Sequence, residues 1–289
     1  MTTKNISRIL NPPAPHMVGD GFRVHNFFPN GYQLDMSPFY MLDYNAKIEF
    51  SARNHPRGVG IHPHRGFETV TIAYHGAIAH HDSAGNSGII YPGDVQWMTA
   101  ASGILHKEYH EENFSKKGGL FQMVQLWVNL PAKDKMSRPK YQDVKQSEMA
   151  KFFLPNHTGT IEIIAGSFEG QKGSISTFTP IEMYNARLNK GSKVSLNFPK
   201  KFNTSLVVID GNIQINDLDV ATADQMVSFK NDGELISIEA LTDAIVLILS
   251  GEPINEPIAA YGPFLMNNNE EIKQAIADYN EGRFGYLEE

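Results

Sequence analysis

The feature that most limits how this chain can fold is a repeated pattern of short runs of β-branched and aromatic residues, each ended by glycine, proline, asparagine or aspartate. From residue 59 onward in the first part of the chain, these runs are ETVTIAYH, GIIYP, VQWMT and MVQLWVNL. Strands this short and this closely spaced are typical of an all-β barrel or sandwich. Helical periodicity is nearly absent over the same residues, so an all-β fold is expected.

A second block with the same pattern follows a polar connector at residues 130–141 that contains two prolines. Its runs include VSLNFP, ELISIEAL and AIVLILSG. Within it, SLVVIDGNIQIN predicts a β-hairpin that turns at Asp210-Gly211-Asn212. Two similar blocks in tandem predict a duplicated barrel, with one barrel over residues 1–140 and a second over residues 141–250.

Helices are expected in two places. A brief helical patch is predicted at residues 147–153, and a full helix is predicted within the tail, residues 251–289, over NNNEEIKQAIADYNEG. Asn268 can cap the start of this helix with Glu271 three residues later, and Gly282 can end it. The helix should pack against a barrel through its apolar stripe of Ile272, Ile276 and Tyr279.

Charge and cysteine content narrow the class of function. The net charge is -7 at pH 7, which disfavours direct nucleic-acid binding because such binding needs a basic surface. The chain has no cysteine, so disulfides, thiolate zinc sites and cysteine nucleophiles are excluded. No apolar run suits a signal sequence or a membrane helix. A cytoplasmic protein that does not bind membranes is expected.

Two short motifs in the first block combine histidine with strand spacing. In His62-Pro63-His64 and in His106-Lys107-Glu108, the outer residues of each triplet lie on the same face of a strand. A His-x-His pair alone is weak, because eleven histidines produce on the order of 0.4 such pairs by chance. Turn residues that let strands bend into a small barrel surround both motifs, namely Gly58, Gly76 (expected to close a hairpin), Pro92-Gly93-Asp94 and Gly103.

Three imidazoles and one carboxylate that meet inside a barrel would form a metal site. Nitrogen and oxygen donors of this kind suit iron, manganese, nickel, copper or zinc, so the ligand types alone do not select the metal. Four protein ligands in an octahedral field leave two positions for water, substrate or dioxygen.

Other histidines and acidic residues are weaker candidates. Glu68 follows His64 by four residues, and its spacing alone allows it to be a ligand. His80 and His81 point to opposite faces of a strand, so at most one points inward, and a solvent-exposed pair is favoured. Ten of the eleven histidines precede residue 111, so the second barrel is expected to bind no metal.

Four separated stretches of the sequence resemble the pirin family of bicupin proteins. The resemblance covers most of the chain, and it is carried by HPHRGFETVTIAYHG, HHDSAGNSGIIYPGDVQWMTAASGILHKEYH, FQMVQLWVNLPAKDKMSRPKYQDV and GEPINEPIAAYGPFLMNN. One departure lies before His106, where TAASGIL stands in place of the family's frequent TAGRGI. The resemblance implies two cupin barrels with one metal in the N-terminal barrel. It implies the ligands His62, His64, His106 and Glu108, with Glu68 outside the ligand set.

The same resemblance implies a function. Pirin-like proteins usually carry iron, so Fe(II) is the expected metal. The implied activity is that of a quercetin 2,3-dioxygenase, which opens a flavonol ring with O2 and releases CO, with Glu108 as the catalytic base. The implied alternative is an iron-binding, redox-sensing regulator that acts through a protein partner, either a transcription factor or a metabolic enzyme. A small aromatic substrate and a monomeric protein are expected.

Overall fold

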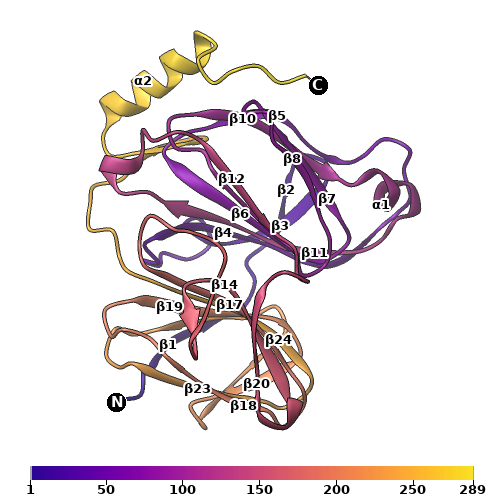
Figure 1. Ribbon diagram of the computed structural model, residues 1–289, viewed down its shortest axis with the longest axis vertical. Coiled ribbons are helices and arrows are strands. Elements are labelled where there is room, and N and C mark those ends of the chain that lie inside the picture. The colour runs from indigo at the N-terminus through magenta and orange to yellow at the C-terminus, as the bar shows by residue number, and fades with distance from the viewer. Residues whose placement is uncertain (1, 289) are drawn as a thin grey trace. The chain divides into compact units, whose positions relative to one another are not determined.

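The computed structural model describes residues 2–288 and is built mainly of β-strands (Figure 1). Contacts between residues divide the chain into two compact units, neither of which is continuous in sequence. The N-terminal unit consists of Ala14–Gln33, Phe39–Gln146 and the chain from Ile254 onward. The C-terminal unit consists of the chain up to Pro13, Leu34–Pro38 and Ser147–Pro253. The sequence predicts that each barrel is one continuous stretch, with boundaries at residues 140 and 250. In the structure, each unit is formed by three separate segments of the chain.

The N-terminal unit contains a seven-stranded and a four-stranded antiparallel sheet. The larger sheet has the order β12-β9-β6-β11-β4-β3-β2, formed by β2 (His16–Val18), β3 (Phe22–Phe28), β4 (Phe39–Phe50), β6 (Phe67–His75), β9 (Val95–Thr99), β11 (Gly119–Asn129) and β12 (Lys140–Val144). The smaller sheet has the order β5-β10-β7-β8, formed by β5 (Gly58–His64), β7 (Ile78–Asp82), β8 (Ser87–Ile90) and β10 (Ile104–His110). Side chains from both sheets share one core, as Phe121 on β11 and Ile78 on β7 show.

The C-terminal unit repeats this pair of sheets. Its larger sheet has the order β1-β22-β19-β24-β17-β14-β13, formed by β1 (Ile6–Leu10), β13 (Ala150–Phe153), β14 (Gly159–Ala165), β17 (Ile181–Leu188), β19 (Asn203–Asp210), β22 (Met226–Phe229) and β24 (Ala244–Gly251). Its smaller sheet has the order β18-β23-β20-β21, formed by β18 (Lys193–Asn197), β20 (Asn212–Ile215), β21 (Asp219–Thr222) and β23 (Leu235–Ala240). A small hairpin pairs β15 (Ser167–Phe168) with β16 (Gln171–Lys172).

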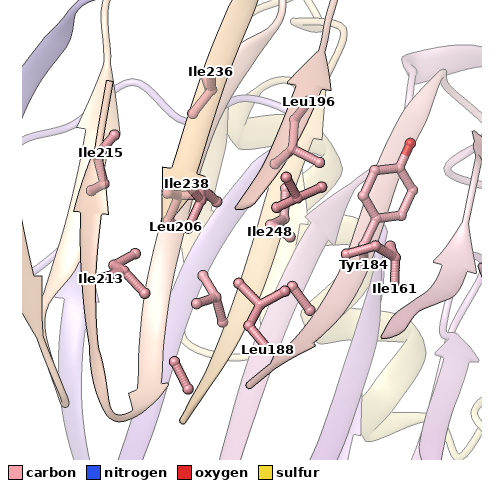
Figure 2. Packing of buried hydrophobic residues seen from close by; sticks show 14 of the residues in the cluster. Ile161, Tyr184, Leu188, Leu196, Leu206, Ile213, Ile215, Ile236, Ile238 and Ile248 are labelled. Atoms are coloured by element: carbon pink, nitrogen blue, oxygen red, sulfur yellow. The ribbon is translucent and has the colours of Figure 1, made fainter. Parts of the chain in front are cut away.

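Apolar side chains fill the space between the two sheets of the C-terminal unit. Figure 2 shows Leu206 and Ile248 from the larger sheet lying close to Leu196, Ile236 and Ile238 from the smaller one. The members of this cluster are buried aliphatic and aromatic residues. The predicted duplication of an all-β barrel is therefore confirmed, and the interior of the second copy is apolar.

In each unit, one glycine turn connects a strand of the larger sheet to a strand of the smaller sheet. Gly76 (φ +81) joins β6 to β7, and Gly211 (φ +78) joins β19 to β20. The predicted hairpins at these turns are wrong, because β19 pairs with β22 and β24 whereas β20 pairs with β21 and β23. A glycine with positive φ serves a corner as well as a hairpin, so the local sequence does not distinguish them.

The predicted helical patch at residues 147–153 is also wrong. Residues 150–153 form β13, in which Ala150 pairs with Ile163 and Phe152 with Ile161. Phe152 packs against the core of the C-terminal unit and Phe153 is exposed, which is the alternation of a strand at a sheet edge. Pairing with β14 outweighs the weak local preference for helix.

The predicted C-terminal helix is confirmed as α2 (Asn269–Asn280). Asn268 Oδ1 accepts the Glu271 backbone N–H at 2.9 Å, and Gly282 follows the helix with φ +73. Ile272 and Ala275 are buried, whereas Tyr279 is 42% exposed, so the buried stripe is narrower than expected. The helix packs within the N-terminal unit against β25 (Ala259–Tyr261) and β26 (Phe264–Met266).

The remaining helical segments are short. They are α1 (Glu112–Lys117) and two 3-10 turns, η1 (Ala132–Asp134) and η2 (Pro155–His157). A search of residues 2–288 finds no helix with the length and apolarity that a membrane crossing needs.

Candidate metal centre

Three neighbouring strands of the smaller sheet in the N-terminal unit carry the candidate ligands. β10 lies between β5 and β7. Across β10 and β5, His106 pairs with His62, and across β10 and β7, Glu108 pairs with His80. Directly paired residues in an antiparallel sheet share a face, and so do residues two apart on one strand. His64 on β5 therefore also faces the same side as His106.

The three predicted histidine ligands converge. The ring centroids of His62 and His106 are 4.2 Å apart, those of His64 and His106 are 4.7 Å apart, and those of His62 and His64 are 4.8 Å apart. One ring nitrogen from each histidine lies within 4.8 Å of the other two. Small ring rotations would place each of these nitrogens at roughly 2.0–2.1 Å from a first-row metal ion bound between them, which is the usual nitrogen–metal distance.

Glu108 lies close to His106, which is one of the three histidines of this cluster. Its carboxylate belongs to a second group with His80 and His106, whose ligand atoms also lie within 4.8 Å of one another. Thr71 donates to Glu108 Oε1 at 3.1 Å, and Gln125 donates to Glu108 Oε2 at 2.8 Å. Neither group found among residues 2–288 contains all four predicted ligands.

Hydrogen bonds show which ring nitrogens are free to bind an ion. His62 Nδ1 lies 2.8 Å from the Gly60 backbone oxygen, so Nδ1 carries the proton and Nε2 keeps its lone pair. His64 Nδ1 and His106 Nε2 are buried and have no hydrogen-bond partner within the described residues. A buried polar atom without a partner costs about 1–3 kcal/mol, and a bound cation would remove that cost.

Burial also controls the charge of two of these rings. It lowers the pKa of His64 and of His106 well below the ordinary value, and the neighbouring histidines lower both further. Both rings are therefore neutral at neutral pH, and neutral imidazole is the form that binds a transition metal. Three nitrogens with a nearby carboxylate fit such an ion and leave positions open for other molecules.

His80 is a residue of the site that sequence reasoning placed wrongly. The predicted solvent-exposed pair is half correct, because His81 is partly exposed whereas His80 is fully buried. The alternation of strand faces allowed one inward residue of the pair, and the pairing of His80 with Glu108 determines which one. A prediction of the β7–β10 register would have found it.

Glu68 lies elsewhere in the N-terminal unit. It sits on β6 in the larger sheet, and its Oε1 accepts the Thr99 hydroxyl at 2.7 Å. Burial raises its pKa from 4.5 to about 7. Glu68 belongs to neither ion-binding group found in the described part of the chain.

Aromatic side chains adjoin the histidine cluster. Phe67 lies 5.0 Å and Trp127 lies 5.3 Å from the His64 ring, and these two rings stack on each other at 4.1 Å. Tyr40 stacks on Trp127 at 6.4 Å, and Tyr141 stacks on His80 at 5.2 Å. Flat apolar rings next to polar donors are typical of sites that bind an aromatic molecule.

Comparisons with known proteins agree over most of the chain. Residues 21–128 match the family model described as Pirin, and residues 183–285 match the model described as Pirin C-terminal cupin domain. A Pseudomonas aeruginosa protein named as a putative quercetin 2,3-dioxygenase is 46% identical over 97% of this chain and 98% of its own length. Pirin of Homo sapiens is 35% identical over 93% of this chain and 90% of its own length.

A solved structure supports the same relationship. The crystal structure of quercetin 2,3-dioxygenase from Acinetobacter baumannii is 43% identical and matches with a TM-score of 0.93, covering 99% of this chain and all of the other. A match of this extent includes both units and the C-terminal helix.

Proposed function

This chain belongs to the pirin family, and on that basis we propose that it is a metal-dependent dioxygenase that opens the ring of a flavonol such as quercetin. The substrates are the flavonol and O2, and CO is released. The single observation that carries the proposal is the convergence of His62, His64 and His106, with unpartnered buried nitrogens on the last two. The names of the bacterial relatives support the substrate class.

His62, His64 and His106 would hold the metal, with Glu108 as the fourth ligand. Fe(II) is the metal we propose, although manganese, nickel, copper and zinc also accept these donors. When bound, the metal supplies Lewis acidity towards a flavonol hydroxyl and a redox-active centre for O2. The neutral state of His64 and His106, which burial enforces, keeps their lone pairs available at neutral pH.

Glu108 is proposed to accept the proton of the flavonol hydroxyl. A cation in direct contact with a carboxylate weakens it as a proton acceptor, so one oxygen of Glu108 must be free when the substrate arrives. The hydrogen bonds from Thr71 and Gln125 reach one oxygen each. They hold the side chain in the site whichever oxygen takes the proton.

The aromatic residues beside the histidines are proposed to orient the substrate. Trp127 is partly exposed and stacks on the fully buried Phe67 beside His64, and a flat flavonol ring can pack on the exposed part of Trp127. Aromatic pairs of this kind contribute about 0.5–1.5 kcal/mol beyond the area they bury.

The proposal is tested on protein that is loaded with Fe(II) without oxygen and then mixed with quercetin in air. Oxygen uptake, CO release and loss of the flavonol absorbance are the expected results, and all three should vanish in His62→Ala. Glu108→Gln should retain metal but lose turnover. Metal retention without oxygen uptake on any flavonoid would contradict the enzyme and favour the alternative, an iron-binding regulator that acts through a protein partner.

A further inference from the structure

We propose that Asp82 and His80 are positioning residues that fix the tautomer of His106 and so present its Nε2 lone pair to the metal. The inference rests on the proposed metal site, and it concerns two residues outside the proposed ligand set. In the row Asp82–His80–His106, one nitrogen of each histidine ring carries the proton and the other keeps its lone pair.

The three side chains form a continuous row in the interior of the N-terminal unit. Asp82 Oδ2 lies 3.3 Å from His80 Nε2, and His80 Nδ1 lies 3.4 Å from His106 Nδ1. All three residues are buried, with at most 3% exposure. Asp82 pairs directly with His106 across β7 and β10, so the row joins two neighbouring strands.

Asp82 sets the direction of the hydrogen bonds because its carboxylate can only accept. Its Oδ1 accepts the backbone N–H groups of Ala84 at 2.9 Å and of Asn86 at 3.0 Å. The Asn86 side-chain amide donates to Oδ1 at 3.1 Å and to Oδ2 at 3.0 Å. These donors hold both oxygens in place, and Oδ2 faces His80.

The protonation of the two rings follows from that end of the row. Because Oδ2 accepts, His80 Nε2 carries a proton, and the neutral ring then has a lone pair at Nδ1. His106 Nδ1 must therefore be the donor in the next bond. The remaining nitrogen, His106 Nε2, has a lone pair and is the buried atom without a partner among residues 2–288.

If His80 instead donated from Nδ1 to His106 while it also donated from Nε2 to Asp82, it would carry a proton on both nitrogens, and this state is incompatible with a bound metal. A second proton on His80 would put a positive charge one ring away from the cation, and like charges at that distance repel. Tyr141 stacks on His80 with an interplanar angle of 24°, which keeps the ring in the plane that both bonds need. Partners of this kind orient metal-binding histidines and tune their affinity.

Asp82→Asn is the decisive substitution because it reverses the row with a side chain of the same shape. It removes the bond from Asn86 Nδ2 to Oδ2 and leaves the bond from Asn86 Nδ2 to Oδ1. Oδ1 receives two backbone N–H groups, so the amide oxygen of the new side chain must stay there. The amide NH2 then takes the place of Oδ2 and donates to His80 Nε2. His80 must carry its proton on Nδ1, His106 must accept there, and His106 Nε2 becomes protonated and unable to bind metal.

The test reads the tautomer directly in metal-free protein with 15N-labelled histidine, by long-range 1H–15N correlation NMR. The unsubstituted protein should show His106 protonated at Nδ1, and Asp82→Asn should show it protonated at Nε2. In parallel, chelator competition should show a loss of Zn²⁺ and Fe²⁺ affinity of about tenfold to a hundredfold in Asp82→Asn.

Two further variants separate positioning from a general effect on structure. Asp94→Asn makes the same change in another turn aspartate, which accepts the backbone N–H groups of Tyr91 and Gln146, and it should change neither tautomer nor affinity. His80→Gln can accept from His106 and donate to Asp82, so it should retain the Nδ1–H tautomer and most of the affinity. His80→Leu should lose at least tenfold.

Several results would overturn the proposal. One is an unchanged tautomer and affinity in Asp82→Asn, and another is pulsed EPR of the Cu²⁺-loaded protein that finds His80 coordinated to the ion. If the unsubstituted protein binds no metal, the proposed function fails instead. The tautomers of the metal-free variants would still decide whether the row acts as described.

Discussion

Arg65, which directly follows the proposed ligand His64, is held by Asp278 on the C-terminal helix, 213 residues later in the chain. Arg65 Nη1 and Asp278 Oδ2 are 2.8 Å apart, and the two side chains are only 5% and 8% exposed. Arg65 Nε also donates to the Ser102 backbone oxygen at 2.7 Å. The end of strand β5 is thus fixed to α2 by a nearly buried ion pair.

Asp278→Ala should lower the free energy of unfolding by about 1–3 kcal/mol, because it leaves a buried guanidinium without its charged partner. The measurement is urea denaturation at pH 7. Lys273→Ala removes an exposed ion pair on the same helix, whose side chains are 71% and 81% exposed, and should cost less than about 0.5 kcal/mol. Equal losses in the two variants would contradict the structural role of Asp278.

The same ion pair predicts a pH dependence. The hydrogen bond from Arg65 is the main cause that holds the pKa of Asp278 below its usual range. The ion pair contributes fully to stability above the ordinary carboxylate pKa of about 3.9. This contribution is lost as the pH falls through the lower pKa that Asp278 has in the folded protein. The difference in unfolding free energy between unsubstituted protein and Asp278→Asn should therefore shrink on acidification below pH 4.

Glu68 predicts the opposite pH dependence. Burial raises its pKa from 4.5 to about 7, so the unfolded chain releases this proton first and folding weakens between pH 4.5 and pH 7. Glu68→Gln removes the effect, and at pH 8 it should be more stable than the unsubstituted protein by on the order of 3 kcal/mol. At pH 4 the two proteins should unfold alike.

A surface carboxylate provides the control for that comparison. Glu112 is 69% exposed and forms only a surface ion pair with Lys116, so Glu112→Gln should change the free energy of unfolding at pH 8 by less than about 1 kcal/mol. A stability gain in Glu68→Gln of the same size at both pH values would mean that packing, and not ionisation of Glu68, is responsible.

Metal binding should raise the thermal stability of the protein. An ion that binds only the folded chain stabilises it by about 2.7 kcal/mol at a free concentration of 100 times Kd. Zn²⁺ should therefore raise Tm, a chelator should reverse the rise, and neither should affect His106→Ala. A shift of the same size in His106→Ala would place the ion elsewhere.

The corner glycine of the C-terminal unit should tolerate substitution poorly. Gly211→Ala forces a Cβ into the backbone oxygen of Asp243 at a positive φ, whereas Gly191 has a similar φ of +83 with open space around it. Gly191→Ala should cost about 1–2 kcal/mol for the backbone conformation alone. Gly211→Ala should cost clearly more by thermal unfolding, and equal costs would contradict the close approach.

The all-β fold and its duplication were predictable because strand runs and turn residues are local features. The corners at Gly76 and Gly211 were not, since a left-handed glycine suits either a hairpin or a change of sheet. Which of the two forms depends on distant partners, such as the pairing of β20 with β23. The strand β13 was missed for the same reason, because its conformation depends on β14.

The candidate site was predictable to the extent that two-residue spacing shows strand faces. That spacing identified His62, His64 and His106, which do converge, whereas their binding of a metal and the role of Glu108 stay predictions. His80 was missed because spacing cannot choose between it and His81. Only the register between β7 and β10 makes that choice.

The assembly of each unit from separated segments affects how the protein is made. When a ribosome has synthesised residues up to 146, the unit with the histidines still lacks everything from Ile254 onward. At that stage Arg65 lacks its partner Asp278. Lys135 lacks the backbone oxygen of Leu265, to which it donates at 2.9 Å in the complete unit. The nascent chain therefore completes this unit only after the residues that follow Ile254 have been synthesised, and a chain that terminates before them lacks Asp278 and Leu265.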